Sequence, residues 1–509
     1  MPAMKPSPAP AASWPENATI YQVNLRSFAA REPRNPVEAL AETAEKRPSP
    51  LAYLADNLPR IAALGFNTLY LLPPYPIGRL GRKGIGSPYA SRDFSRIEPE
   101  YGTRAEMVRL VRAAHKLSIK VLFDITPNHT ARDHVWMSQH PDYYVRNPDG
   151  SAFFDCDWSD TAKLDYTSPA FRRAMVETLD GWLSFLGRGD GIDGYRFDMA
   201  HFINDRSFWD EALAELRRRH PDRPLLFLAE CYGFGNNCDL FRRGMTAAYD
   251  DDFYKFSQYA YATGEADGAS RLALSADAEG NGDFRPLLEA WRAGGPAAAA
   301  RELFAHYESA AREIGPGHLT ARYVDNHDEG RGLARFGEGA VKAMMSLAFF
   351  APRTIPFVLC GEEFGALNRP SIHARCSACD KGPRVIAADG REWRREGVEF
   401  EGNVFARGAA DRKAWYRFFQ RLFRLRATLP ALSAGAYKPL ALAEQAPETE
   451  KSVFAFARSS GKEKILFAVN LSDKPARVSL ARFRSGRPLL GPVPEKNELS
   501  GFEAVAVRL

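Results

Sequence analysis

The sequence predicts an α/β chain whose main part is a (β/α)8 barrel of parallel strands, followed by a smaller antiparallel β-sandwich. Helix-period segments and short apolar strands alternate from about residue 50 onward, in about eight units. After about residue 435 the pattern changes to short alternating strands, which is typical of a separate β domain. No GxGxxG motif follows an early strand, so an open doubly wound sheet is disfavoured.

Each predicted barrel strand is a short apolar run. The eight strands are expected at residues 19–28, 67–73, 119–125, 192–197, 224–230, 245–251, 319–326 and 354–365. The helical segments between and after them are residues 51–65, 104–117, 168–186, 205–220, 239–244, 296–314, 337–350 and 412–429. Apolar residues recur in these segments at the spacing of an amphipathic helix, which suits helices that surround a barrel.

Three stretches interrupt the alternation and help to divide the chain. Residues 130–166 are rich in Asp, His and aromatic residues, and residues 262–296 and 366–410 are expected to be long loops. The expected parts are a disordered lead at 1–16, the barrel at 17–129 and 167–434, a small excursion after strand three at 130–166, and the C-terminal β-sandwich at 435–509.

Composition excludes several classes of partner and location. The 509 residues include 68 Lys and Arg against 63 Asp and Glu, without a long basic run, so no nucleic acid partner is expected. No segment has the apolar length of a membrane span, and the first residues lack a secretory core, so we expect no membrane contact and a cytoplasmic location. The six cysteines fit reduced thiols, and the Cys376/Cys379 pair lacks the second ligand pair of a zinc site.

Charged residues gather at the predicted C-terminal ends of strands three, four, five and seven. They are Asp124, His129, Arg196, Asp198, Glu230, Asp325, His327 and Asp328. Each one alone has an ordinary explanation as a cap, a turn former or a buried polar residue. Together they favour an active site, because these strand ends meet at one rim of a barrel. Several carboxylates with Arg and His nearby suit glycosidic bond cleavage, in which one attacks and another donates a proton.

Four of these segments also carry a family resemblance. DITPNH, GYRFDMAH, FLAE and YVDNHD, in this order and at these separations, resemble the four signature regions of the α-amylase family of retaining α-glucan-active enzymes. PFVLCGEEFG resembles the eighth strand of that family, and GSPYASRDFSRIEPEYGT resembles its second β/α loop. The resemblance covers essentially the whole chain. It implies a TIM barrel that cleaves α-1,4-glucosidic bonds of malto-oligosaccharides or starch-like chains.

The resemblance assigns roles to individual residues of this chain. Asp198 is implied to be the nucleophile, Glu230 the general acid/base and Asp328 the transition-state stabiliser. Arg196 is implied to orient the nucleophile, with Asp124 as its structural partner. The residues implied to bind substrate are Tyr89, Asp93, His129, Arg196, His201 and His327. Retaining chemistry predicts a separation of about 5 to 5.5 Å between the carboxyl groups of Asp198 and Glu230.

Departures from the family pattern keep two alternatives open. Many members have Lys and then His three and four residues after the nucleophile, whereas this chain has His201 and Phe202, and Pro88 replaces a usual Gly. The acceptor side is therefore expected to differ, and the acceptor distinguishes a hydrolase from an α-glucanotransferase. A non-catalytic carbohydrate-binding barrel is the other alternative, but such proteins typically lack one of the three acids.

A metal requirement is the remaining expectation. No cofactor is expected to be required, and calcium is the one candidate ion. Asn128 matches a position that helps to bind calcium in dependent members of the family, and Asp155, Asp157 and Asp160 follow it in FFDCDWSD. Carboxylate and amide oxygens are suitable ligands for Ca²⁺. The alternative is an acidic loop that is simply solvated.

Overall fold

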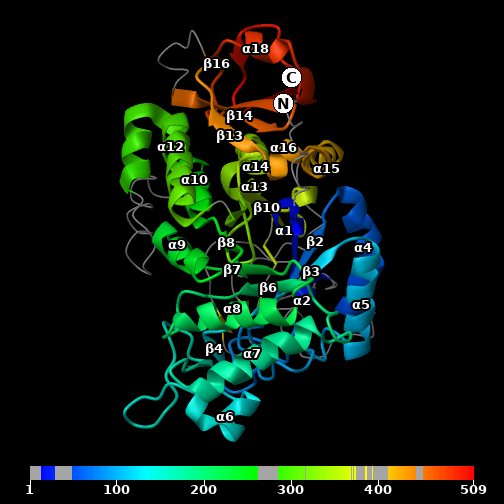
Figure 1. The fold of residues 1–509 in the computed structure, drawn as a ribbon, viewed down its shortest axis with the longest axis vertical. Coiled ribbons are helices and arrows are strands. Elements are labelled where there is room, and N and C mark those ends of the chain that lie inside the picture. The colour runs from blue at the N-terminus through cyan, green and yellow to red at the C-terminus, as the bar shows by residue number, and fades with distance from the viewer. Residues whose placement is uncertain are drawn as a thin grey trace, which may run out of the picture.

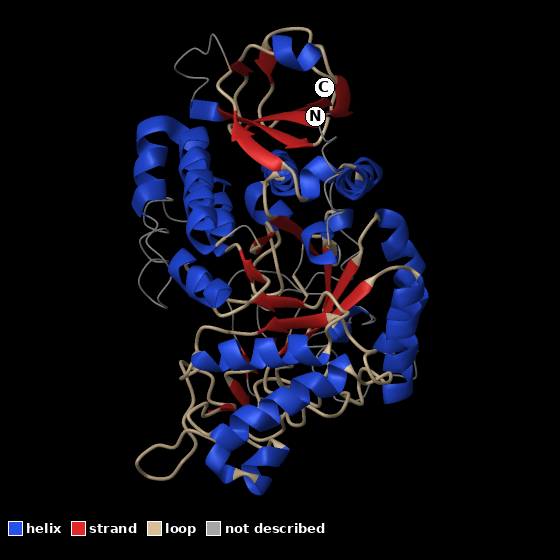
Figure 2. Cartoon of the chain, viewed as in Figure 1, coloured by secondary structure: helices blue, strands red, loops and turns tan. Residues whose placement is uncertain are grey.

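Eight parallel strands form a closed barrel in the computed structural model, in the order β1-β10-β9-β8-β7-β6-β3-β2. Strands lie in the middle of the chain, with helices around them (Figure 2). The strands are β1 Ile20–Val23, β2 Thr68–Leu71, β3 Lys120–Ile125, β6 Gly194–Phe197, β7 Leu226–Ala229, β8 Ala247–Tyr249, β9 Leu319–Arg322 and β10 Thr354–Leu359. All eight lie inside the segments predicted from the sequence, so the predicted barrel is confirmed.

The structure describes most of the chain, with gaps. The described residues are 13–28, 49–261, 285–315, 317–367, 369–370, 372–373, 385–386, 392–393, 411–442 and 451–509. Most of the predicted lead, much of the two predicted long loops and the Cys376/Cys379 pair therefore lie outside the described residues.

Helices follow the strands and cover the outside of the barrel (Figure 1). The longer ones are α4 Pro50–Leu64, α5 Arg104–Lys116, α7 Pro169–Leu183, α8 Ser207–Arg219, α9 Phe234–Arg242, α10 Asp251–Tyr261, α12 Arg285–Ile314, α14 Glu338–Phe350 and α15 Arg412–Thr428. The short ones are α1 Trp14–Asn17, α2 Leu25–Phe28, α6 Val135–Gln139, η1 Pro141–Tyr143, α13 Gly332–Phe336, η2 Glu362–Phe364, α16 Pro430–Ser433 and α18 Ala481–Arg484. Local sequence explains several starts: Thr103 and Glu106, for example, form a capping box at the start of α5.

The expected loop at 262–296 is wrong in its last part, because α12 already begins at Arg285. Residues 285–293 include the helix formers Leu, Glu and Ala, and the following Gly294 and Gly295 take non-helical angles. The two glycines therefore mark a kink within α12 rather than the end of a loop.

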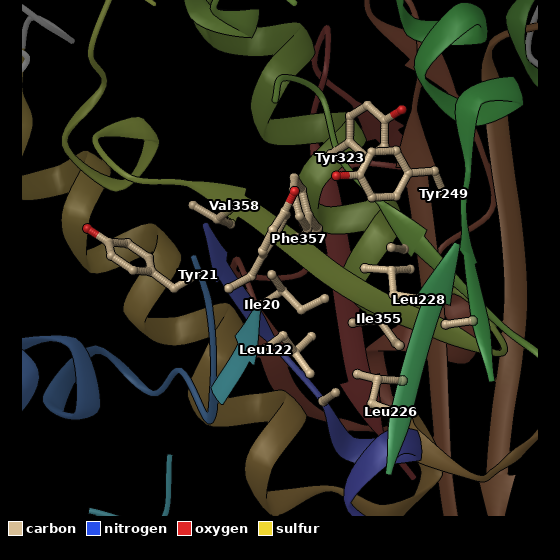
Figure 3. Close-up of a cluster of buried hydrophobic side chains, with 14 of the residues drawn as sticks. Ile20, Tyr21, Leu122, Leu226, Leu228, Tyr249, Tyr323, Ile355, Phe357 and Val358 are labelled. Carbon is tan, nitrogen blue, oxygen red and sulfur yellow. The ribbon is translucent and has the colours of Figure 1, made fainter. Parts of the chain in front are cut away.

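Alternation along the strands explains why polar groups gather at one end of the barrel. Ile20, Leu122, Leu226 and Ile355 are fully buried and gather between the strands (Figure 3). Because side chains two apart share a face of a strand, Gln22 follows Ile20, Asp124 follows Leu122, and Glu230 follows Leu226 and Leu228 on the inner face. The apolar side chains thus fill the barrel, and the polar ones close its C-terminal end.

Gly194 is required where β6 approaches β7. A Cβ atom at this position would lie 1.9 Å from the carbonyl oxygen of Leu226. In the barrel sheet, Gly194 pairs with Leu226 of β7 on one side and with Leu122 of β3 on the other side. The same register sets Asp124 of β3 beside Arg196 of β6.

Two smaller units adjoin the barrel at opposite ends of the view in Figure 1. After β3, strand β4 His129–Ala131 pairs antiparallel with β5 Thr161–Lys163, and α6 lies between them in sequence. At the C-terminus, a five-stranded sheet has the order β13-β14-β15-β19-β17 and a two-stranded sheet pairs β16 with β18. The predicted C-terminal antiparallel β structure is thus confirmed, whereas the domain boundaries stay predictions.

The C-terminal sheet packs on helices of the barrel. The ring centroids of Phe350 in α14 and Phe467 in β15 are 4.7 Å apart, and those of Phe304 in α12 and Phe454 in β14 are 5.3 Å apart. The strands of this region are β13 Ala436–Pro439, β14 Val453–Ser460, β15 Glu463–Asn470, β16 Ala476–Arg477, β17 Arg487–Leu490, β18 Glu498–Leu499 and β19 Ala504–Arg508.

One further short pair of strands precedes α15 and consists of β11 Val385–Ile386 and β12 Glu392–Trp393. Among the described residues, no helix combines the length and apolarity needed to cross a bilayer.

Candidate active site

A single buried guanidinium group lies at the centre of the polar end of the barrel. The Arg196 side chain is fully buried, and its Nη1 donates to Asp124 Oδ1 at 2.9 Å and to Asp198 Oδ1 at 2.8 Å. Its Nη2 lies 2.6 Å from Glu230 Oε1. The predicted pairing of Asp124 with Arg196 is confirmed. Three carboxyl groups therefore share one positive charge in a site from which water is largely excluded.

This crowding of acids favours the uptake of a proton. Burial raises the pKa of Asp198 well above its usual value, the negative charge of Glu230 raises it further, and Arg196 opposes the shift. Burial also raises the pKa of Asp124 to about 6, against the lowering effect of Arg196. Closely spaced carboxyl groups that cannot all be ionised are suited to acid/base chemistry.

The Glu230 carboxyl group is held by the segments that follow β6 and β7. The backbone N–H of Met199 donates to Glu230 Oε2 at 2.9 Å, and the Tyr232 hydroxyl donates to Glu230 Oε1 at 3.0 Å. Met199 has a φ of 43°, a left-handed conformation that is unusual for a residue other than glycine. Such local strain directly after Asp198 aims the Met199 N–H at the neighbouring carboxylate.

A chain of hydrogen bonds joins the segment after β9 to this cluster. The His327 Nδ1 lies 2.8 Å from Gln22 Nε2, and its Nε2 lies 2.5 Å from the Tyr89 hydroxyl. The Tyr89 hydroxyl donates to Asp124 Oδ2 at 2.8 Å. Asp328 Oδ2 lies 3.0 Å from His327 Nε2, and the Asp328 side chain is 44% exposed. Asp328 therefore stands on the open side of the cluster, where a ligand from solvent can reach it.

Two known protein families match the sequence of this chain. The family described as Alpha amylase, catalytic domain, matches residues 39–435, which is well over half of the chain. The chain belongs to the α-amylase family. Residues 444–490 match a second family, described as Maltogenic Amylase, C-terminal domain.

Individual relatives of this α-amylase-family chain are distant. It is similar to Alpha-amylase MalA of Haloarcula japonica, with 27% identity over 72% of this chain and 47% of the relative. It is also similar to Alpha-1,4-glucan:maltose-1-phosphate maltosyltransferase of Rhodospirillum rubrum, with 33% identity over 35% of this chain and 28% of the relative. The chain thus spans about half or less of the length of these two curated relatives. A crystal structure of an alpha-amylase from Lactobacillus plantarum has a TM-score of 0.68 at 25% identity and covers 97% of this chain and 99% of its own.

Two histidines of the α-amylase-family motifs flank the cluster. His129 is buried beside Trp158, with ring centroids 5.2 Å apart, and His201 contacts the Tyr232 ring at 5.7 Å. Burial lowers the pKa of each histidine to about 4. Both rings are therefore neutral at pH 7, so they are suited to hydrogen bonding with hydroxyl groups rather than to charge pairing.

Asp93 is not brought into the cluster. Its Oδ1 accepts hydrogen bonds from the Ser95 backbone N–H at 2.8 Å and the Ser95 hydroxyl at 2.6 Å, and its Oδ2 lies 3.4 Å from Arg96 Nε. It lines a different pocket, whose lining includes none of the three acids assigned to catalysis. The sequence indicated correctly that Asp93 follows β2, but not which way its side chain points.

Three polar residues of the site were missed by sequence reasoning. Gln22 contacts His327, Tyr232 contacts Glu230, and the Tyr70 hydroxyl donates to Asp124 Oδ2 at 2.6 Å. Gln22 offered a signal, because it is a polar residue in an otherwise apolar strand. Tyr70 offered none, since tyrosine is a common strand residue.

The residues proposed to bind calcium do not fit that ion. The Lys163 ammonium group donates to Asp155 Oδ1 at 2.7 Å, to Asp155 Oδ2 at 2.9 Å and to the Phe202 carbonyl at 3.2 Å. Asn128 turns its NH₂ group toward Asp155, donating at 2.8 Å, rather than its oxygen toward a cation. A lysine charge thus takes the place that a cation would need beside Asp155.

The other two candidates also fail to converge on an ion. The Asp157 side chain is 89% exposed and lies 3.8 Å from Lys83, and Asp160 is buried. Within the described part of the chain, no group of three or more His, Cys, Asp or Glu side chains is arranged to hold a metal.

Chelation should therefore leave the protein unchanged, whereas removal of the lysine should not. We expect excess EDTA to leave the unfolding temperature constant. Lys163→Met should lower the free energy of unfolding by about 2 kcal/mol, because the largely buried Asp155 loses its charged partner and keeps only the hydrogen bond from Asn128. Lys83→Met is the matched control, since its exposed partner Asp157 is stabilised by water. Thermal unfolding monitored by circular dichroism measures all three, and a drop with EDTA that Ca²⁺ reverses would contradict this assignment.

Proposed function

We propose that this chain cleaves α-1,4-glucosidic bonds of malto-oligosaccharides or starch-like chains by a retaining mechanism. The observation that carries the proposal is the Arg196 guanidinium, which contacts Asp198 at 2.8 Å and Glu230 at 2.6 Å on its two terminal nitrogens. One guanidinium thus holds both carboxyl groups in the same site, and we propose that they form the closely spaced pair of a retaining enzyme. Family membership supports the same chemistry.

Each acid then has a distinct task. Asp198 and Glu230 titrate as a pair, and in the reactive form their shared proton lies on Glu230. The Asp198 carboxylate then attacks the anomeric carbon while Glu230 gives this proton to the departing glycosidic oxygen, which leaves a glycosyl ester on Asp198. Glu230, now ionised, removes a proton from the incoming acceptor hydroxyl, and attack on the ester releases Asp198. Asp328 contributes negative charge on the open side, where it can stabilise an oxocarbenium-like transition state.

Neutral groups around the acids are suited to hold the sugar. His327 is fixed by Gln22 and Tyr89, and His129 lies beside Trp158. These contacts restrict the rings before substrate binds, so that less conformational freedom is lost on binding.

An α-glucanotransferase is the second candidate. The supporting observation is the aromatic contact that replaces the usual acceptor residues: the Phe202 ring lies 4.8 Å from His201 and 6.1 Å from Trp158. An apolar surface on the acceptor side of the site favours binding of the face of a sugar ring, so that a sugar competes with water as the acceptor. The similarity to a maltosyltransferase is consistent with this candidate.

Product analysis distinguishes these candidates. Incubation with pure maltopentaose, with and without added phosphate, should give only shorter products with rising reducing ends if the acceptor is water. Longer and shorter products with constant reducing ends would establish a transferase. Unchanged maltopentaose, bound equally by the native protein and by Glu230→Gln, would refute catalysis and leave a carbohydrate-binding barrel.

We also propose a cytoplasmic location. Among the described residues, Cys231, Cys238 and Cys360 are free thiols. Reduced thiols are typical of proteins in a reducing compartment.

A further inference from the structure

A pocket lies beside the segment that carries Tyr89. It has a volume of about 880 Å³ and is lined largely by the loop between β2 and α5. Five guanidinium groups line it, from Arg26, Arg79, Arg82, Arg92 and Arg96. Its size falls in the range of about 300 to 1,000 Å³ that is typical of small-molecule sites.

The acids of this pocket are already occupied. Asp93 bonds with Ser95 and Arg96, as described above. Glu98 accepts backbone N–H groups through both oxygens, from Ile77 at 2.8 Å and from Glu100 at 3.1 Å. Glu100 lies 3.7 Å from Arg26, which is itself buried. The three carboxylates therefore leave the pocket with a surplus of two positive charges.

Two arginines of the pocket are available to an anionic ligand. Across the described part of the chain, neither the Arg79 nor the Arg92 guanidinium has a hydrogen bond or an ion pair, although the Arg79 backbone N–H donates to Asp133. Arg92 is half-buried, so part of its charge is held away from water. Two guanidinium groups that share a pocket and lack an anionic partner among the described residues favour an anionic ligand.

One arginine is fixed in position before any ligand binds. The Arg26 Nη1 donates to the carbonyls of Gly86 at 2.7 Å and Ile372 at 2.6 Å. Its Nε has no hydrogen bond, although it lies near Glu100. A fixed arginine reduces the conformational cost of binding.

We propose that this pocket binds a phosphate group, either free or as the ester of a small molecule such as a sugar. The planar guanidinium forks of Arg79 and Arg92 suit the tetrahedral oxygens of phosphate, which accept paired N–H donors. Ile77, Ile97 and Val135 line the same pocket and provide apolar walls for the rest of an ester. The site is distinct from the proposed catalytic centre and its occupation requires no turnover.

The loop offers a physical connection between the two sites. Tyr89 contacts Asp124 and His327 in the catalytic cluster, and Arg92, three residues later, lines the pocket. The Arg92 carbonyl accepts the Val135 N–H at 3.0 Å, which ties this segment to α6. A ligand on Arg92 would therefore bind to the segment that positions Tyr89.

Calorimetry on the full chain tests the proposal with three probes, which are glucose 1-phosphate, inorganic phosphate and neutral maltose. We expect saturable binding of a phosphate probe that weakens as salt is raised. Arg79→Gln and Arg92→Gln should each weaken it roughly ten-fold or more, because each loses a charge-assisted bond. Arg482→Gln removes an exposed charge of the C-terminal region and should have no effect.

The outcomes separate the sources of the phosphate. Tighter binding of the ester than of inorganic phosphate would identify a phosphorylated small molecule, and equal affinities would identify phosphate itself. Arg79 is exposed, so Arg79→Gln should remain folded even if Arg92→Gln does not. The absence of saturable phosphate binding, or binding that Arg79→Gln leaves unchanged or that Arg482→Gln weakens equally, would overturn the proposal.

Discussion

Asp198→Asn should reduce turnover of maltopentaose by at least about 10³-fold while the barrel stays folded. The substitution is nearly isosteric and removes the nucleophilic charge. The amide oxygen can still accept the hydrogen bond that Arg196 now donates to Asp198 Oδ1 at 2.8 Å. Loss of activity should therefore not be accompanied by loss of structure. Steady-state kinetics and circular dichroism, measured on the same preparation, check both parts.

The control for this prediction is a carboxylate that lies outside the cluster. Asp93→Asn affects an acid that bonds with Ser95 and Arg96, and it should leave kcat nearly unchanged. Activity of Asp198→Asn within ten-fold of the native protein would refute the assignment of the nucleophile.

Arg196→Leu should produce the largest loss of stability. It would leave Asp124, Asp198 and Glu230 without their shared positive charge, and Asp124 is fully buried. Removal of one partner of a buried ion pair costs about 3 to 5 kcal/mol. Urea unfolding at pH 7 measures the change, with Arg109→Leu as the control, because Arg109 and Asp56 form an exposed pair.

The pH dependence of this loss has a defined sign. Burial already raises the pKa of Asp124 to about 6 with Arg196 present, and the guanidinium lowers it. Without Arg196 the folded-state pKa rises further above the unfolded value, so the folded protein binds more protons than the unfolded one. Its stability must then fall as the pH rises and recover as the pH is lowered through the raised pKa. A deficit that is constant from pH 5 to pH 8 would show that lost packing, rather than charge, is responsible.

The barrel could be predicted because its signals are local and repeated. Each strand is an apolar run that follows a segment with the apolar spacing of a helix. Side chains along a strand point to alternate faces, so Arg196 and Asp198, two residues apart, share a face. The family motifs then placed Asp198, Glu230 and Asp328 at the same rim, although their roles remain predictions.

What the sequence left open depends on side-chain direction and long-range contact. Asp93 lies four residues from Tyr89 yet lines a different pocket, because the loop bends between them. Lys163 contacts Asp155 only because β5 returns beside β4, which no local pattern reveals. Gln22 and His327 are more than 300 residues apart in the sequence and meet because the barrel closes.

Trapping of the covalent intermediate tests the central claim most directly. A ring-fluorinated maltosyl fluoride has a good leaving group, and its ring fluorine slows hydrolysis of the glycosyl-enzyme, so the ester on the nucleophile should accumulate. Peptide mapping by mass spectrometry should find the added sugar on the peptide that contains Asp198, and find none in Asp198→Asn. An adduct on a peptide without Asp198, or turnover of the reagent with inversion and no adduct, would contradict the account.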